Sequence, residues 1–254
     1  MNEKTIIIDI GNSFVKIKNN EDINFIYLDD LVIDKIKNSV DLANINSAII
    51  SSVNTDMECV LVDFLASNKI TVKLADTLLR SQKFIDFSNI QGMGNDRKLG
   101  LIGALSFYKP PIITIDCGTA ITINILSKDS ICLGGAIMCG VGTQTRALSE
   151  YASGLPAIKI NKANYGIING TEDAINTGLI SAVRGGITDF LYNIFYKEKL
   201  ENTNVAFTGG YSDLVFKLCV KKLNKINTNS KKINKIEQRK NLVFLGLEKL
   251  IGIM

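Results

Sequence analysis

Two stretches of the chain repeat the same order of apolar and polar positions. Residues 6–13 read IIIDIGNS, and residues 113–120 read ITIDCGTA. In each, a β-branched run ends on an aspartate, one residue intervenes, a glycine and a small polar residue follow, and a second apolar run begins. This pattern predicts a strand, a tight turn and a second strand. We therefore expect two β-hairpins that derive from one duplicated unit.

The spacing of apolar residues elsewhere predicts further strands and helices. The expected strands are Asn24–Tyr27, Ser47–Ser52, Thr71–Leu74, Ser130–Ala136 and Val205–Phe207. The expected helices are Asp56–Ser67, Lys98–Tyr108, about Thr143–Ser153, and Thr171 to about Lys199. Strands near the start of each half, with helices after them, predict an α/β protein with mixed sheets covered by helices. We place an N-terminal lobe at residues 1–109 and a C-terminal lobe at residues 110–254.

Composition limits the class of protein. With 254 residues, 46% of them hydrophobic, and only three prolines, the chain can bury a sizeable core. The opening apolar run Thr5–Ile10 is too short, and too soon interrupted by Asp9, for a signal or membrane segment. We expect a cytoplasmic protein without a membrane partner. The five cysteines form no CxxC pair, so neither a disulfide framework nor a zinc site is indicated.

The chain contains no histidine. This absence excludes Ser-His-Asp and Cys-His catalysis, His-ligated metal centres and histidine phosphocarriers. Any general base must therefore be a carboxylate, a lysine or a tyrosine.

The formal net charge of +4 is unevenly distributed. The stretch from Lys217 to Lys240 contains nine Lys or Arg residues and one acid, so its net charge is +8 and that of the remainder is −4. A nucleic-acid site would also need aromatic residues, and none occurs between Phe216 and Phe244. We interpret the stretch as a solvated helix end and a polar loop around Asn227–Ser230, and expect no nucleic-acid partner.

The first hairpin carries the residue types of a phosphate site. Glycine at a turn lets the backbone approach a ligand, amides and hydroxyls can face phosphate oxygens, and an aspartate can hold the neutralising cation. Asp9, Asn12, Ser13 and Lys16 supply these groups. The structural alternative is that Asp9 only caps the amides of its turn.

Motifs along nearly the whole chain resemble those of type III pantothenate kinases, within the superfamily of sugar kinases, actin and heat-shock ATPases. The motifs are Asp9-Ile10-Gly11-Asn12-Ser13-Phe14-Val15-Lys16, Gly94-Asn95-Asp96-Arg97, Asp116-Cys117-Gly118-Thr119-Ala120, Gly134-Gly135-Ala136-Ile137, Leu155-Pro156, Gly170-Thr171 with Gly178, Thr208-Gly209-Gly210 and Leu245-Gly246-Leu247. The resemblance implies two ribonuclease-H-like lobes with a cleft between them, and ATP-dependent phosphorylation of pantothenate to 4'-phosphopantothenate, the first step of coenzyme A synthesis.

The resemblance also implies a role for each matching residue. The ATP-binding residues would be Asp9, Ile10, Gly11, Asn12, Ser13, Phe14, Val15, Lys16 and Thr119. The substrate-binding residues would be Phe87, Gly94, Asn95, Asp96, Arg97 and Thr171. Asp116 would hold a monovalent cation, K⁺ or NH₄⁺, and Asp9 would hold Mg²⁺. The family is dimeric, so a homodimer is expected.

Asp96 is the candidate catalytic residue. A carboxylate is too weak to deprotonate an alcohol beforehand, so its task is to orient the hydroxyl and accept the proton late in a loose phosphoryl transfer. Arg97 can grip the carboxylate of pantothenate with two parallel hydrogen bonds. The alternative for both is an ordinary helix start, and Thr171, followed by Glu172 and Asp173, has the same alternative.

Some positions depart from the family pattern. A tyrosine, an Asn-Pro pair and a glutamate are usual where this chain has Phe87, Asn89-Ile90 and Gly92. Cys139 stands where proline is usual, and Asn95 where a small residue is usual. These changes concern the acceptor side of the site, so a kinase of another small hydroxy acid, a nucleotidase and a regulatory accessory protein of bacterial transcription remain alternatives.

Overall fold

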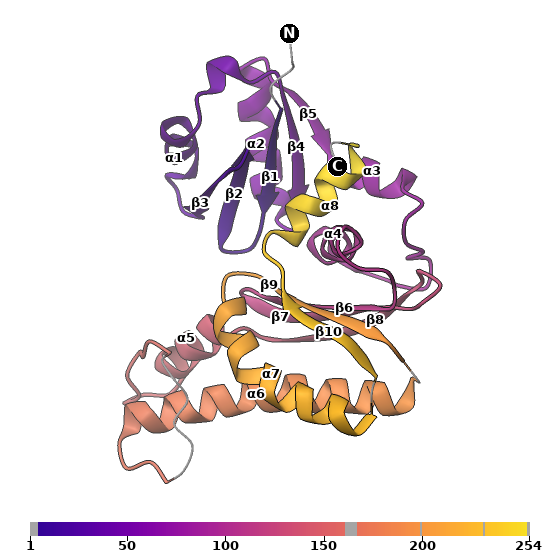
Figure 1. Cartoon of the computed structure of the whole chain (residues 1–254). Coiled ribbons are helices and arrows are strands. Elements are labelled where there is room, and N and C mark those ends of the chain that lie inside the picture. Colours follow the sequence, from indigo (N-terminus) through magenta and orange to yellow (C-terminus); the bar gives the residue numbers. More distant parts are fainter. Residues whose placement is uncertain (1–4, 161–166, 199, 231, 253–254) are drawn as a thin grey trace. The chain divides into compact units, whose positions relative to one another are not determined.

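The computed structural model describes residues 5–160, 167–198, 200–230 and 232–252. The chain forms two compact units (Figure 1). Unit 1 contains residues Met1–Phe107 and Leu242–Met254, and unit 2 contains Tyr108–Asn241. The boundary after Phe107 lies close to the expected one, but the last segment belongs to unit 1 rather than to the C-terminal lobe.

Unit 1 is built on a five-stranded mixed sheet in the order β3-β2-β1-β4-β5. Its elements are β1 (Thr5–Ile10), β2 (Phe14–Asn19), β3 (Asp22–Tyr27), α1 (Val32–Ser39), the short 3₁₀ helix η1 (Leu42–Asn44), β4 (Ser47–Ser52), α2 (Thr55–Ser67), β5 (Thr71–Leu74), α3 (Ala75–Ser81), α4 (Asn95–Ala104) and α8 (Leu242–Leu250). Strands β1 and β2 form the predicted antiparallel hairpin, and β1 pairs in parallel with β4.

The two faces of this sheet differ in chemistry because side chains alternate along each strand. Ile6, Ile8 and Ile10 point into a hydrophobic core that α1 and α2 complete. Asp9 and Lys16 lie on the opposite face, where Lys16 bonds to Asp9. Helices α4 and α8 pack on that second face. The period of two therefore directs the polar residues of the first motif toward the helix that carries Asp96.

Helix α8 belongs to unit 1 because it packs tightly on α4. A Cβ atom on Gly103 of α4 would lie 2.0 Å from the carbonyl oxygen of Leu242. A Cβ atom on Gly246 of α8 would lie 2.2 Å from the carbonyl oxygen of Leu99. The two helix backbones are thus in direct contact, and only glycine fits at either position.

Unit 2 repeats the architecture with a second five-stranded sheet, in the order β10-β9-β6-β7-β8. Its elements are β6 (Ile112–Cys117), β7 (Ala120–Leu126), β8 (Cys132–Cys139), α5 (Val141–Tyr151), α6 (Thr171–Lys197), β9 (Thr203–Thr208), α7 (Ser212–Ser230) and β10 (Ile233–Gln238). Numbered from the first strand of each unit, both sheets have the order 3-2-1-4-5, with the same parallel and antiparallel pairings. The predicted duplication of the fold is confirmed.

The core of unit 2 also lies on one face of its sheet. Ile113, Ile115 and Cys117 pack against α6 and α7, which run along one side of the sheet in Figure 1. Asp116, between Ile115 and Cys117, takes the opposite face, as Asp9 does in unit 1. Cys117 is buried and unpaired with other cysteines, and burial raises the pKa of its thiol.

The basic stretch corrects one sequence-based expectation. Asn227–Ser230 were predicted to form a polar loop, but α7 continues through Ser230 and Ile233–Gln238 form the edge strand β10. Strand β10 pairs in parallel with β9. Asn234 and Lys235 are neighbours in the strand and both are exposed, so the sequence lacks the regular apolar alternation that would have indicated a strand.

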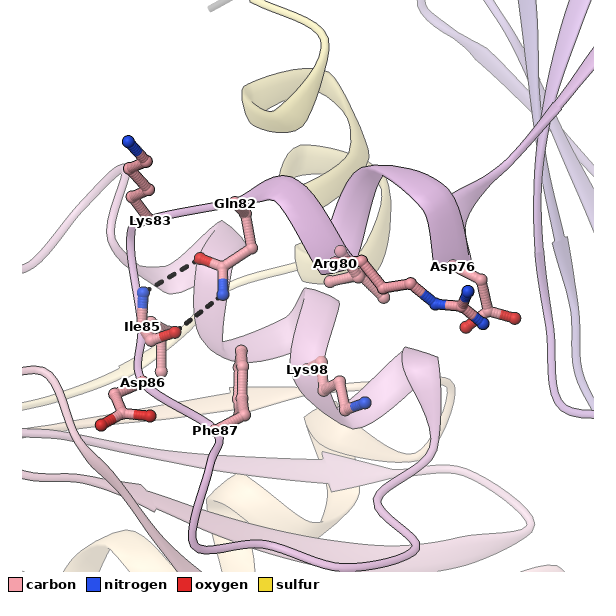
Figure 2. Close-up of a pocket in the computed structure, with 9 residues that line it drawn as sticks. Asp76, Arg80, Gln82, Lys83, Ile85, Asp86, Phe87 and Lys98 are labelled. Atoms are coloured by element: carbon pink, nitrogen blue, oxygen red, sulfur yellow. Dashed lines mark hydrogen bonds between the residues drawn. The ribbon is translucent and has the colours of Figure 1, made fainter.

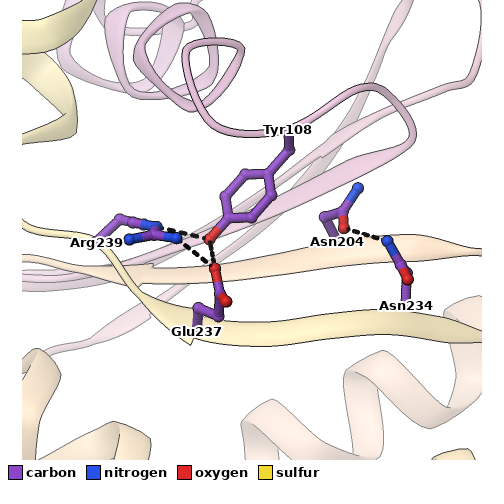
Figure 3. A network of polar contacts seen from close by, with 5 residues as sticks. All are labelled: Tyr108, Asn204, Asn234, Glu237 and Arg239. Carbon is purple, nitrogen blue, oxygen red and sulfur yellow. Dashed lines mark hydrogen bonds and ion pairs between the residues drawn. The ribbon is translucent and has the colours of Figure 1, made fainter.

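A polar network joins the start of unit 2 to its last strand (Figure 3). The Tyr108 hydroxyl donates to Glu237 Oε2 at 2.7 Å, and Arg239 donates to the Tyr108 oxygen at 3.0 Å and to Glu237 at 2.6 Å. Burial, together with Glu237, raises the pKa of Tyr108 to about 12. Beside it, Asn234 donates to Asn204 at 2.9 Å. The network thus links Tyr108, at the start of unit 2, to strand β10 and Arg239 at its end.

Gly135 in the Gly134-Gly135 motif provides a test of the β7–β8 pairing. A Cβ atom at Gly135 would lie 1.7 Å from the carbonyl oxygen of Ile123. We expect Gly135→Ala to force the strands apart and to lower the unfolding free energy by roughly 2–4 kcal/mol. Gly185→Ala is the matched control, since nothing lies within 4 Å of its added Cβ in helix α6. Urea unfolding followed by circular dichroism measures both, and equal stabilities would contradict the assignment.

Candidate active site

The first sequence motif forms an ion pair across the β1–β2 hairpin. Lys16 Nζ donates to Asp9 Oδ2 at 2.8 Å, and the two residues are direct partners in the antiparallel register. Asp9 is only 3% exposed. A buried carboxylate needs a cation or several hydrogen-bond donors, and Lys16 supplies the charge.

The turn between the two strands is held by backbone bonds. The Gly11 amide donates to the Phe14 carbonyl at 2.9 Å, and the Leu28 amide donates to the Ser13 carbonyl at 3.0 Å. Asn12 at the tip is exposed and Ser13 is half-buried. The loop is thus a fixed backbone turn whose tip side chain is available to a ligand.

Asp96 lies in the electrostatic field of this ion pair. It is the second residue of α4, and its Oδ1 accepts a hydrogen bond from the Arg97 amide at 2.8 Å. Burial raises the pKa of the Asp96 carboxyl and the Asp9 carboxylate adds to the rise, while the Arg97 amide bond and the charges of Arg97 and Lys16 oppose it. Unit 1 therefore brings four predicted site residues, Asp9, Lys16, Asp96 and Arg97, within electrostatic reach of one another.

Gly94 makes room for the Asp96 carboxylate. A Cβ atom at Gly94 would lie 2.6 Å from Asp96 Oδ1 and 3.4 Å from Val53 Cγ1. Gly94 is the N-cap of α4, and no side chain caps the helix there. The motif therefore needs glycine at position 94, because a larger side chain there would collide with the Asp96 carboxylate.

Ser51 is a further candidate for the site, and the sequence did not reveal it. It is the parallel-register partner of Asp9 on β4 and is only 1% exposed. Within the described part of the chain, its hydroxyl oxygen has no hydrogen-bond partner. A buried hydroxyl without a partner is unfavourable, and such groups often mark a site for a ligand, ion or water. Only the strand pairing, which brings Ser51 beside Asp9, could have identified it.

Phe87 and Lys98 line a pocket of about 590 Å³ within unit 1 (Figure 2). Helix α3 and the segment 82–87 provide most of its other walls. The Gln82 side chain fixes that segment by bonding the backbone of Ile85 in both directions, at 2.7 and 3.0 Å. Lys98 Nζ lies 5.9 Å from the centroid of the Phe87 ring. Neither Asp96 nor Arg97 lines this pocket, although both belong to the same helix as Lys98.

The second motif occupies the equivalent place in unit 2. Asp116 is half-buried and pairs in register with Thr208 of β9. A Cβ atom at Gly209, where φ is +91°, would lie 2.3 Å from Asp116 Oδ1. Gly209, the first of the two glycines after β9, is therefore required beside Asp116. In contrast to Asp9, the register partner of Asp116 on the next strand of its hairpin is Thr122, not a lysine.

Thr119 and Thr171 are exposed positions of unit 2. The Thr119 carbonyl accepts hydrogen bonds from the Gly140 amide at 3.0 Å and the Thr143 hydroxyl at 2.7 Å, which fixes the hairpin tip to the start of α5. Thr171 is the first residue of α6, and Gly170 is the N-cap without a side-chain cap bond. Thr171 therefore lies at the start of α6, with the acidic residues Glu172 and Asp173 beside it in the first turn, so a role at the helix start and a role in substrate binding are compatible.

The sequence matches the family model of type III pantothenate kinase over residues 5–192. That range includes both hairpins, the Gly94–Arg97 motif and Thr171. The chain belongs to the type III pantothenate kinase family. By this membership it is a kinase, a transferase that uses ATP and functions in coenzyme A biosynthesis.

Named relatives agree with this family assignment. A type III pantothenate kinase from Desulforapulum autotrophicum is 31% identical over 188 residues, covering 73% of this chain and 70% of the relative. One from a Sulfurihydrogenibium species is 30% identical over 182 residues, covering 70% of each.

Solved structures agree on the fold. A Baf family protein from Campylobacter jejuni superposes with a TM-score of 0.64 at 20% identity, with 98% of both chains covered. A ROK family protein from Streptococcus pneumoniae gives 0.52 at 12% identity, also with 98% of both chains covered. This chain thus shares with these proteins the fold of two mixed sheets found in actin-like and sugar-kinase ATPases.

No three acidic or cysteine side chains gather into a metal-binding cluster within the described ranges. Nor is any described helix long and apolar enough to cross a membrane.

The Asp9–Lys16 pair predicts a measurable cost of removing the lysine alone. Lys16→Met leaves the buried Asp9 carboxylate without this cation, so we expect the unfolding free energy to fall by roughly 1–3 kcal/mol. Asp9→Asn in the same chain should recover much of the loss. Lys35→Met is the control, because the Lys35–Asp29 pair is exposed and such pairs contribute less than about 1 kcal/mol. Equal losses for Lys16→Met and Lys35→Met in urea unfolding would contradict this account.

Proposed function

We propose that this kinase transfers the γ-phosphoryl group of ATP to the primary hydroxyl of pantothenate, forming 4'-phosphopantothenate and ADP. The hydroxyl oxygen forms the new bond to phosphorus, the bond to the β–γ bridging oxygen breaks, and the hydroxyl proton passes to a carboxylate. The observation that carries the proposal is the placement of Asp96 in the field of Asp9 and Lys16, at the start of α4.

Asp96 is proposed as the catalytic residue that orients the hydroxyl and accepts its proton. Its raised pKa supports this role, because a carboxylate in a site that resists ionisation is a better proton acceptor than one in water. Arg97, next to it, is proposed to bind the carboxylate of pantothenate. Gly94, Asn95, Phe87 and Thr171 complete the proposed acceptor set.

The nucleotide is proposed to bind through the first hairpin and Thr119. The backbone of the 10–15 turn and the Ser13 hydroxyl would face phosphate oxygens, and Lys16 would contribute positive charge. The donor set fits Mg²⁺: the Asp9 carboxylate and the Ser51 hydroxyl, which has no partner among the described residues, are two hard oxygen groups on neighbouring strands. Asp9 would hold the ion, which when bound neutralises charge on the transferring phosphates.

The remaining proposals rest on the family resemblance. Asp116 is proposed to hold K⁺ or NH₄⁺ beside Gly209. The half-buried carboxylate is consistent with this, since a hard cation prefers oxygen ligands. We also propose a cytoplasmic homodimer that binds neither nucleic acid nor membrane.

A coupled assay of ADP formation tests the function directly. Wild-type protein with ATP, Mg²⁺, K⁺ and pantothenate should turn over, and mass spectrometry should identify 4'-phosphopantothenate. Replacing K⁺ with Na⁺ should lower the rate if Asp116 holds the monovalent cation. A wild-type protein that binds ATP but phosphorylates no pantothenate would overturn the proposal and favour a regulatory role.

Asp96→Asn separates catalysis from stability. Loss of the proton acceptor should lower kcat by about 10²–10⁴-fold. Because the folded-state pKa of Asp96 is raised, its ionised form is disfavoured by folding, and stability falls as pH rises through the titration. The neutral asparagine escapes that penalty, so the variant should melt no lower than wild type at pH 7. Robust turnover by the variant would remove Asp96 from its role.

Ser51→Ala tests the neighbouring hydroxyl. Because that oxygen has no partner among the described residues, we expect the folded protein to be as stable as wild type or more so. If Ser51 contributes to the metal or phosphate site, the KM for MgATP should rise several-fold while the KM for pantothenate stays constant. Ser47→Ala at the other end of β4 is the control, and unchanged MgATP affinity for Ser51→Ala would exclude Ser51 from the site.

A further inference from the structure

Helix α8 contacts elements of unit 1 that precede and carry the proposed acceptor residues. Its Gly246 touches α4, which begins with the Asp96–Arg97 motif. Lys249 Nζ lies 5.3 Å from the centroid of the Phe84 ring, in the segment that leads to Phe87. The same short helix therefore borders both parts of the proposed acceptor site.

A third contact joins α8 to the first hairpin. Lys18 of β2 forms an ion pair with Glu248, and their side chains are only 15% and 12% exposed. Lys18 lies two residues after Lys16 and so on the same face of the strand. Removing one partner of a pair with so little exposure leaves a charge without compensation. This pair fixes α8 to the sheet that carries the proposed phosphate site.

We propose that α8 is the positioning element for the acceptor half of the reaction, with Gly246 and Glu248 as its positioning residues. The inference rests on the proposed function. Glu248 fixes α8 to β2, and the contact at Gly246 sets the distance from α8 to α4. Helix α4 then holds Asp96 and Arg97 within electrostatic reach of the Asp9–Lys16 pair. Neither positioning residue needs to touch a substrate.

A displacement of the α4 backbone at the glycine contact would move the start of α4 as well, because the helix has only ten residues. Gly103 lies near the end of α4, about two turns from Asp96, so movement of the crossing point shifts the whole helix. An added Cβ at Gly246 would require the backbones to separate, since the contact is with the carbonyl oxygen of Leu99 and not with a flexible side chain. The β1–β2 hairpin would keep its own hydrogen bonds and ion pair.

Gly246→Ala and Gly100→Ala form a matched pair of variants on this contact. Among the residues that the structure describes, no atom lies within 4 Å of a Cβ built on Gly100, which is buried in α4 itself. A shift of roughly 1 Å can cost about 10²-fold in rate. We expect Gly246→Ala to lower kcat at least 10-fold and to raise the KM for pantothenate, with the KM for ATP changed less than about 2-fold. Gly100→Ala should leave all three constants unchanged.

A merely structural role for α8 gives a different result. Partial unfolding reduces the fraction of active molecules, so kcat would fall with both KM values unchanged and in proportion to the lost circular dichroism signal. That outcome would overturn the inference. Equal kinetic constants for folded Gly246→Ala and wild type would overturn it as well.

The ion pair provides a second route if Gly246→Ala does not fold. Glu248→Gln should produce the same split between pantothenate and ATP constants, in smaller degree. Exchanging the charges, with Lys18→Glu and Glu248→Lys together, should restore at least half of the lost kcat. A folded Glu248→Gln variant with wild-type constants, or a charge exchange that restores nothing, would contradict a positioning role.

Hydrogen exchange distinguishes failure of this inference from failure of the proposed function. If α8 holds α4, the amides of Lys98, Leu99, Ile102 and Gly103 should exchange at least 10-fold faster in Gly246→Ala or Glu248→Gln than in Gly100→Ala, whatever the substrate. Unchanged exchange would refute the positioning role even in an active kinase. Faster exchange in a protein that does not phosphorylate pantothenate would leave α8 as the positioning element and overturn only the acceptor.

Discussion

The ion pair between Asp9 and Lys16 is the interaction on which the candidate site depends. Burying a carboxylate on the second face of a sheet is costly, and Lys16 offsets that cost from the neighbouring strand. The pair holds the two strands of the hairpin at the end that carries the turn. It also sets the electrostatic environment in which Asp96 lies, since Asp9 raises the pKa of that carboxyl and Lys16 opposes the rise.

The two units show how one topology supports different chemistry. Asp9 and Asp116 occupy equivalent places, each on the face of its sheet opposite the hydrophobic core. Their partners differ, because Lys16 faces Asp9 whereas Thr122 faces Asp116. The Asp9 carboxylate is balanced by a lysine, whereas the Asp116 carboxylate lies beside the glycine backbone that follows β9. The duplication thus provides two geometrically similar positions with different charge.

Much of the fold follows from local pattern. Both hairpins, the strand at Ser47–Ser52, helix α2 and the long helix α6 have clear periodicity, and the structure places them close to their predicted bounds. Features that depend on distant parts of the chain were not predictable. Strand β10 lacks a regular apolar alternation, the close contact of α8 with α4 involves glycines far apart in sequence, and Ser51 meets Asp9 only through strand pairing. The motif residues of unit 1 were identified from sequence, but the reason for each glycine required the three-dimensional contacts.

The return of α8 to unit 1 affects the order in which the protein can fold during synthesis. All residues of unit 2 leave the ribosome before Leu242, whereas the first unit lacks a packed helix until the segment after Asn241 has emerged. Domains usually fold in the order of their synthesis. In this chain unit 1 is synthesised first, but helix α4 can be covered by α8 only after synthesis of unit 2 is complete. Unit 2 can therefore fold before unit 1 is complete. The buried residues of α4 therefore gain their full cover only after the ribosome has translated unit 2.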